Sequence, residues 1–406
     1  MGEQPFSFTP FAAPFRFVWL LRGCSAFGSQ MLAFALALQL YQISRSALDL
    51  GMLGLIQFGP SLALALPAGH LSDRFPPGRV AVAVQMLNAF AAAMLIAASL
   101  SRAGLTTILF GAAFLTGGTR AFEHPINTAL LPSTIAEQHI PAAVAWTTTV
   151  AKLATLIGPM TGGVLYALAP RASYGAALLF FLAAAAAGAA LPKRVVSVLS
   201  QLRGLRSAFA GFAVVRRDRV LGGAMALDLL AVLLGGATAL LPAIALDVLH
   251  AGPAELGVLR AAPGLGAILI GLWIARRPVQ RNAGRTLLVA TALFGVLTCV
   301  FGLSRSFPLS VLLLGGIGAA DMVSIHIRSA LMQLRTPPEL RGRVGAVNGI
   351  FISSSNQIGA FESGLTAYWF GLVSSVVIGG AATVAVTAAI AALIGPLRKV
   401  DRPFDK

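Results

Sequence analysis

Twelve long apolar segments are the feature that most constrains how this chain can fold. They cover approximately residues 17–43, 49–71, 80–101, 105–131, 141–167, 172–191, 220–248, 254–275, 285–304, 307–334, 344–369 and 374–395. About 20 apolar residues in a helix cross the hydrocarbon core of a bilayer, so each segment is long enough for one span. Gly and Pro inside several segments are tolerated in lipid because neighbouring helices satisfy the freed backbone groups. The sequence therefore predicts an all-α integral membrane protein with twelve transmembrane helices.

The composition excludes a water-soluble globule. Of the 406 residues, 57% are hydrophobic and 11% are charged, whereas a soluble domain carries roughly 25% charged residues. The twelve segments leave no room for a large additional domain. No nucleophile–base constellation and no metal-ligand spacing of His or Cys stands out, so we expect neither an enzyme nor a cofactor. A membrane receptor or scaffold is the non-transport alternative.

The excess of positive charge indicates the orientation of the chain. With 30 Lys and Arg against 14 Asp and Glu, the formal net charge is +16. If the N-terminus is cytoplasmic, 21 of the 30 basic residues fall in cytoplasmic segments, 4 on the opposite side and 5 within helices. Membrane proteins collect Lys and Arg on the cytoplasmic side. The distribution predicts that both termini are cytoplasmic, and the charge requires no nucleic-acid partner.

One long polar stretch divides the chain into two halves. We expect an N-terminal six-helix half over residues 1–191, a cytoplasmic basic linker over 192–219, and a C-terminal six-helix half with a short tail over 220–406. Apolar residues recur within the linker at three- and four-residue spacing, from Leu199 to Val215. This pattern predicts an amphipathic helix on the inner leaflet. A plain basic linker is the alternative, because Gly204 and Gly211 weaken a helix.

Internal repeats support a duplication. The string 49–51 (Asp-Leu-Gly) is echoed 206 positions later by 255–257 (Glu-Leu-Gly). The strings 129–131 (Ala-Leu-Leu) and 157–158 (Ile-Gly) are echoed 201 positions later by 330–332 (Ala-Leu-Met) and 358–359 (Ile-Gly). Similar strings in the same order at nearly constant offset indicate two homologous halves, an architecture of secondary transporters.

Two motifs resemble those of the major facilitator superfamily. Residues 69–74 read Gly-His-Leu-Ser-Asp-Arg and are followed by Arg79, which is similar to the family's loop signature. Residues 158–163 read Gly-Pro-Met-Thr-Gly-Gly, which resembles the GPxxGG motif of its antiporters. With the strings 15–16 (Phe-Arg), 120–122 (Arg-Ala-Phe) and 340–344 (Leu-Arg-Gly-Arg-Val), the chain resembles the bacterial enterobactin-exporter and macrolide-efflux branch. The second-half equivalent of the loop signature, residues 275–285, lacks the Asp-Arg pair.

The resemblance implies two pseudo-symmetric six-helix halves, alternating access and a bacterial inner-membrane location. It also implies a cytoplasmic latch that stabilises the outward-facing state, formed by Gly69, Asp73, Arg74 and Arg79 with Arg343 as an available partner. Anchoring of the topology by Arg74 and Arg79 alone is the alternative. For the second motif, Gly158, Gly162 and Gly163 allow close helix approach and Pro159 bends the helix. The family links this motif to export, and ordinary small-residue packing is compatible with that role.

Ionisable residues inside the apolar segments are the most informative candidates, because they are costly in a membrane unless they are paired or functional. The acids are Glu123, Asp228, Asp321 and Glu362, and the bases are Arg22, Arg120, Lys152, Arg260 and Arg328. Helical spacing places Arg120, Glu123 and Asn127 on one stripe, and Asp321, Ser324 and Arg328 on another. The two repeat offsets make Asp321 equivalent to Arg120, and Asp228 equivalent to Arg22. By the resemblance, the helices that carry these stripes line the central cavity.

A buried carboxylate beside an arginine can couple protonation to conformation, because burial and the neighbouring charge act on its proton affinity in opposite directions. We expect Asp228 or Asp321 to be the proton-coupling acid, followed by Glu123 and Glu362. A static ion pair that holds helices in register is the alternative for each acid.

Amides and aromatics among the apolar runs suggest the character of the substrate. The cavity candidates are Gln30, Phe34, Gln39, Asn127, Trp146, Asn356, Gln357 and Phe361. Such a lining suits a small amphipathic organic molecule, siderophore-like or drug-like. The sequence thus predicts a monomeric secondary transporter that exports this molecule by proton antiport. An importer or a lysophospholipid flippase of the same fold is the alternative.

Overall fold

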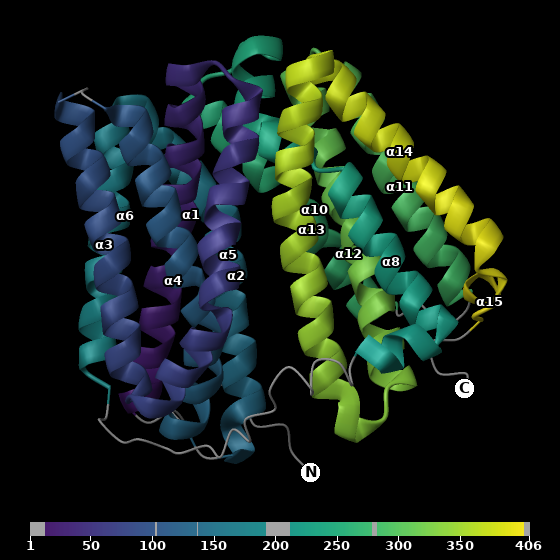
Figure 1. The fold of residues 1–406 in the computed structure, drawn as a ribbon, viewed down its shortest axis with the longest axis horizontal. Coiled ribbons are helices and arrows are strands. Elements are labelled where there is room, and N and C mark those ends of the chain that lie inside the picture. The colour runs from purple at the N-terminus through teal and green to yellow at the C-terminus, as the bar shows by residue number, and fades with distance from the viewer. Residues whose placement is uncertain (1–12, 102–103, 136, 192–211, 278–281, 402–406) are drawn as a thin grey trace. The chain divides into compact units, whose positions relative to one another are not determined.

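A computed structural model of the chain describes residues 13–101, 104–135, 137–191, 212–277 and 282–401 (Figure 1). Contacts group the chain into two compact units, and each is described by itself. Unit 1 comprises residues 1–39 and 56–200, and unit 2 comprises residues 40–55 and 201–406. The end of the first helix and the start of the second thus belong with unit 2, whereas the sequence-based division assigned residues 1–191 to one half.

Unit 1 is built from six long helices. They are α1 (Ala13–Ser44), α2 (Ala47–Arg74), α3 (Pro77–Ser101), α4 (Leu105–Thr134), α5 (Ile140–Leu168) and α6 (Pro170–Ala189). A 3-10 turn, η1 (Glu137–His139), precedes α5. Helix α3 packs against α4 and α6, and α5 also packs against α6.

Unit 2 repeats this arrangement. Its helices are α8 (Arg219–Leu234), α10 (Pro253–Arg276), α11 (Ala283–Leu303), α12 (Phe307–Arg335), α13 (Arg341–Phe370), α14 (Leu372–Leu393) and the short α15 (Gly395–Arg398). Helix α11 packs against α12 and α14, and α13 against α14, as α3, α4, α5 and α6 do in unit 1. After α8 the backbone breaks at Gly235 and Gly236 and continues as η2 (Ala237–Leu240), α9 (Leu241–Ala243) and the π-helical η3 (Ile244–Val248). A 3-10 turn, η4 (Pro338–Leu340), precedes α13.

All twelve predicted segments correspond to helical segments, the seventh being broken. Within the residues that the structure describes, ten of these are long and apolar enough to cross a membrane. The other two, α4 and α13, have 30 residues each but carry internal charges, which include Glu123 and Glu362. Within the linker, residues 212–217 are helical and 192–211 lie outside the described residues. The predicted amphipathic helix therefore stays a prediction.

Close helix crossings confirm the predicted duplication in three dimensions. A Cβ atom added to Gly117 in α4 would lie 2.3 Å from the carbonyl oxygen of Gln57 in α2. In unit 2, a Cβ added to Gly318 in α12 would lie 1.9 Å from the carbonyl oxygen of Pro263 in α10. The offsets of 201 and 206 residues found in the sequence convert the first glycine–partner pair into the second. The same contact between the same two helices is thus built in both units.

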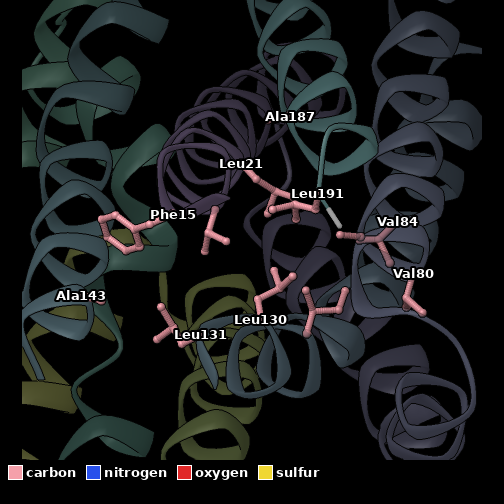
Figure 2. Packing of buried hydrophobic residues seen from close by; sticks show 12 residues of the cluster. Phe15, Leu21, Val80, Val84, Leu130, Leu131, Ala143, Ala187 and Leu191 are labelled. Atoms are coloured by element: carbon pink, nitrogen blue, oxygen red, sulfur yellow. The ribbon is translucent and has the colours of Figure 1, made fainter. Parts of the chain in front are cut away.

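The core of unit 1 holds helices together by dense apolar packing. Figure 2 shows side chains of α1, α3, α4 and α6 converging in one buried cluster, among them Leu21, Val84, Leu130 and Ala187. Lipid tails are as apolar as these side chains, so the hydrophobic effect adds little to helix association within the bilayer. Van der Waals contact in such clusters supplies that association instead.

Polar contacts fix the helix ends of unit 2. Asp218 caps α8 by accepting hydrogen bonds from the backbone N–H groups of Val220 (2.8 Å) and Leu221 (3.2 Å), and its other carboxylate oxygen lies 3.2 Å from Arg335 at the end of α12. At the start of α11, the Asn282 N–H donates to the Asp401 carboxylate at 3.0 Å. The carboxylates satisfy N–H groups that a helix leaves without internal partners.

The crossing of α10 and α12 predicts which glycine of α12 tolerates a methyl group. Gly318→Ala should destabilise the protein by about 1–3 kcal/mol, because the new Cβ would overlap backbone that cannot move independently. Gly315→Ala is the matched control on the same helix, since its Cβ would meet its nearest neighbour, the Ala262 oxygen, at 3.7 Å. Thermal unfolding in detergent should show a lower Tm for Gly318→Ala alone. Equal Tm values for the two variants would contradict the crossing.

Candidate functional site

A polar cavity of about 480 Å³ opens within unit 1 between α1, α3, α4 and α5. Side-chain hydrogen bonds tie its walls together. The amide of Gln85 on α3 donates to the Ser25 hydroxyl on α1 at 2.8 Å, and the amide of Gln30 on α1 donates to the Thr155 hydroxyl on α5 at 3.3 Å. Asn127 also lines the cavity. Two of the predicted cavity residues, Gln30 and Asn127, therefore line the same cavity.

Three charged side chains face this cavity. Arg22 projects from α1, and Arg120 and Glu123 project from α4 as the predicted stripe requires. Glu123 is exposed to the cavity and interacts electrostatically with both arginines. Among the described residues, neither guanidinium closes an ion pair with Glu123. The cavity thus holds one net positive charge with two guanidinium groups available on its wall.

Unit 2 carries a second charged cluster with a different arrangement. Asp228 on α8 and Arg328 on α12 form an ion pair, and only 8% and 5% of their surfaces are exposed. Asp321 and Ser324 of α12 line a space of about 10 Å³ beside Asp228. Here Asp228 and Arg328 neutralise each other in the interior of the unit, and little volume is left beside them.

The two clusters occupy equivalent positions with opposite charge. The offset of 206 residues relates Arg22 to Asp228, and the offset of 201 relates Arg120 to Asp321 and Asn127 to Arg328. The duplicated helices therefore present two arginines in unit 1 where unit 2 presents two aspartates. The pairing of Asp228 with Arg328 in particular required the structure, because their helices are far apart in sequence.

Phe34 and Gln39, which the sequence predicted as substrate contacts, do not line the cavity of unit 1. Phe34 is fully buried on α1 beside Gly162. The Gln39 carbonyl accepts a hydrogen bond from the Tyr174 hydroxyl at 2.6 Å, and its amide lies 3.4 Å from the Ser99 hydroxyl. Both belong to the interior of unit 1, because the cavity opens along the face of α1 that bears Arg22 and Gln30.

The remaining cavity candidates are dispersed. Trp146 packs against the apolar cluster of unit 1. On α13 the amide of Asn356 donates to the Ile352 carbonyl at 2.8 Å, Gln357 lies against Gly54, and the backbone oxygen of Phe361 approaches Gly51. Both of these glycines belong to unit 2 through residues 40–55.

The other charged candidates lie at separate positions. Glu362 accepts a hydrogen bond from the Thr366 hydroxyl at 3.0 Å on α13. Lys152 is exposed on α5, and Arg260 is half-buried on α10 and has an interaction partner. Within the described part of the chain, no group of three His, Cys, Asp or Glu residues could hold a metal ion.

The antiporter motif forms a close contact between α5 and α1. All four signature residues are buried, and they are Gly158, Pro159, Gly162 and Gly163. A Cβ on Gly158 would lie 2.7 Å from the Gln30 Cβ. The glycine thus lets α5 approach α1 at a residue that lines the polar cavity.

The predicted latch is only partly described. Gly69 and Asp73 belong to the last turns of α2, and the side chain of Asp73 lies outside what the structure describes. Arg74 and Arg79 are exposed, and Arg343 is half-buried at the start of α13. The latch therefore stays a prediction.

The sequence did not predict one polar contact, which joins Asp247 to Tyr41 and Arg45. Asp247 on η3 accepts hydrogen bonds from the Tyr41 hydroxyl and from Arg45, the latter at 2.9 Å. All three belong to unit 2. The available signal was an aspartate near the end of the seventh apolar segment, with Arg45 just outside the first.

With this geometry in view, comparison with known proteins decides the family. A sequence profile of the family described as transmembrane secretion effector matches residues 6–403. The chain belongs to this family of major facilitator transporters. The predicted superfamily is thereby confirmed, and the protein is a membrane transporter.

Curated relatives and solved structures agree with this assignment. The enterobactin exporter EntS of Citrobacter koseri is 26% identical over 398 residues, which cover 96% of this chain and 94% of the relative. The enterobactin exporter EntS of Shigella boydii is 26% identical over 347 residues, covering 84% and 81%. A bacterial homologue of the lysosomal transporter Spinster matches with a TM-score of 0.67 at 13% identity, over 95% of this chain and 97% of that one. A bacterial homologue of ferroportin matches with a TM-score of 0.65 at 16% identity, over 92% and 98%. These two structural likenesses show the shared fold.

The buried ion pair of unit 2 predicts a large coupling between its two members. Asp228→Asn or Arg328→Gln alone should cost about 3–5 kcal/mol of stability, because each leaves one buried charge without a partner. The double variant should recover much of that loss, since no net charge remains buried. Thermal unfolding of the four proteins in detergent measures this cycle. The exposed pair Arg45–Asp247 is the control and should show only weak coupling. Additive losses for Asp228 and Arg328 would contradict a functional ion pair.

Proposed function

We propose that this transporter exports a small amphipathic organic molecule, siderophore-like or drug-like, from the cytoplasm in exchange for protons. The observation that carries the proposal is the similarity to an enterobactin exporter along 96% of this chain. The GPxxGG motif and its buried contact with Gln30 support export. We place the protein in a bacterial inner membrane with both termini in the cytoplasm, acting as a monomer by alternating access.

The proposed coupling acids are Asp228 and Asp321, with Glu123 and Glu362 as further candidates. Asp228 and Arg328 form a buried ion pair between two helices, and Asp321 lies beside them. Protonation of a carboxylate in such a pair removes the attraction that joins the helices. A movement that separates the helices would in turn favour the protonated acid. Binding of a proton and change of conformation are thereby linked.

Transport driven by a pH gradient tests the proposal. Purified protein in proteoliposomes should move a siderophore or a macrolide opposite to an imposed proton gradient. Asp228→Asn or Asp321→Asn should abolish accumulation driven by the gradient while leaving exchange of substrate down its own gradient measurable. Glu339→Gln is the control, because Glu339 is exposed in η4.

Other outcomes would redirect the assignment. Movement of only lysolipids or sugars would contradict the proposed substrate. Transport that ignores the pH gradient, or that survives neutralisation of each of the four acids in turn, would contradict proton coupling. Movement of substrate in the same direction as protons would contradict antiport.

A further inference from the structure

We infer that the cavity of unit 1 is a binding site for an organic anion, so that the exported molecule is an amphipathic acid. Arg22 and Arg120 would hold its acidic group, and the apolar part of the wall would hold its body. The inference rests on the proposed function in one respect, namely that the molecule bound in this cavity is the one that the protein exports.

Charge is the first argument. The ionisable side chains of the lining are Arg22, Arg120 and Glu123, so positive charge is in excess. Arginine presents a planar fork of donors that matches a carboxylate or another oxyanion, and two such groups on one wall can share one acid. A cationic substrate would meet two like charges for each attractive one.

The contrast between the repeats is the second argument. At the equivalent positions of unit 2, Asp228 is already paired with Arg328 inside the protein, and the adjoining space is about 10 Å³. In unit 1, position 127 carries an asparagine instead of the arginine, and the cavity measures about 480 Å³. The same helix pair is therefore closed by its own charges in one unit and open to an external charge in the other.

Size and lining give the third argument. Small-molecule sites commonly measure about 300–1,000 Å³ and combine apolar walls with a few placed polar groups. Besides its polar residues, this cavity is lined by Leu21, Ala26, Ala81, Val84, Ile126 and Ala151. The hydrogen bonds from Gln85 to Ser25 and from Gln30 to Thr155 hold three of the contributing helices in place. An acid with an aromatic or aliphatic body fits this combination.

Glu123 distinguishes an anionic from a cationic ligand, because removing its charge should change the affinity for the two in opposite directions. It lies in the same cavity and interacts with both arginines, so it competes with an incoming anion for them. Removing its charge should strengthen the binding of an anion. A cationic ligand would instead lose its only opposite charge.

Binding of a matched charge series to the purified full-length protein tests the inference. The probes are naphthoate, neutral naphthamide and naphthylmethylammonium, which share one ring system, titrated by calorimetry in a neutral detergent. Naphthoate should bind tightest. Arg22→Gln or Arg120→Gln should weaken it about tenfold, the equivalent of one charge-assisted hydrogen bond. Glu123→Gln should tighten it, and Arg305→Gln at an exposed position should have no effect.

Conservative variants keep the test independent of folding. Arg22→Lys and Arg120→Lys retain the charge and should bind naphthoate between the wild type and the Gln variants. Equal binding of all three probes, or weaker naphthoate binding in Glu123→Gln, would overturn the inference. Displacement of naphthoate by stoichiometric phosphatidylglycerol would assign the site to a lipid and overturn it as well.

The two proposals fail separately. If proteoliposomes export a neutral or cationic compound against protons while naphthoate binds without dependence on Arg22 or Arg120, the anion site is wrong and the exporter stands. If naphthoate binds as expected and no organic acid is moved by a pH gradient, the anion site stands and proton-driven export is wrong.

Discussion

The absence of water from the bilayer core decides how these helices can associate. Apolar side chains gain little there by leaving lipid for another helix, so close packing must supply the attraction. Glycines provide it at the crossings: Gly117 lies against Gln57, and Gly318 against Pro263. Because the two contacts are related by the offsets of the sequence repeat, both copies keep the same close contact between two helices. Each unit contains a helix crossing of this kind.

The same absence of water makes every charge inside the membrane energetically unfavourable, and the two units accommodate their charges in different ways. Unit 2 closes Asp228 onto Arg328 in its interior. Unit 1 keeps Arg22, Arg120 and Glu123 on the wall of an open cavity, where they can be solvated or can meet a ligand. A pair closed in the interior suits a coupling element that responds to protonation, and an open cluster suits recognition. One duplicated scaffold thus provides two kinds of polar site.

Much of the architecture could be predicted because it depends on local properties of the chain. The apolar runs marked the helices within a few residues, and the stripe of Arg120, Glu123 and Asn127 followed from helical spacing alone. The cavity of unit 1 does not include Phe34 and Gln39, and local properties of the chain could not show this. Both lie in an apolar run, and nothing local distinguishes the positions of α1 that line the cavity from those that are buried among other helices. The contact of Asp247 with Tyr41 and Arg45 was missed because it joins residues about 200 positions apart.

The sequence by itself determined the solvent, the helices, the duplication and the family, since hydropathy, repeat offsets and motifs are all written along the chain. Only the tertiary structure decided which charges meet. Asp228 forms a buried ion pair with Arg328, whereas Arg22 and Arg120 line a cavity together with Glu123. The reason is physical: the cost of an intramembrane charge depends on what lies within a few ångströms of it, and that neighbourhood is set by how helices far apart in sequence pack together.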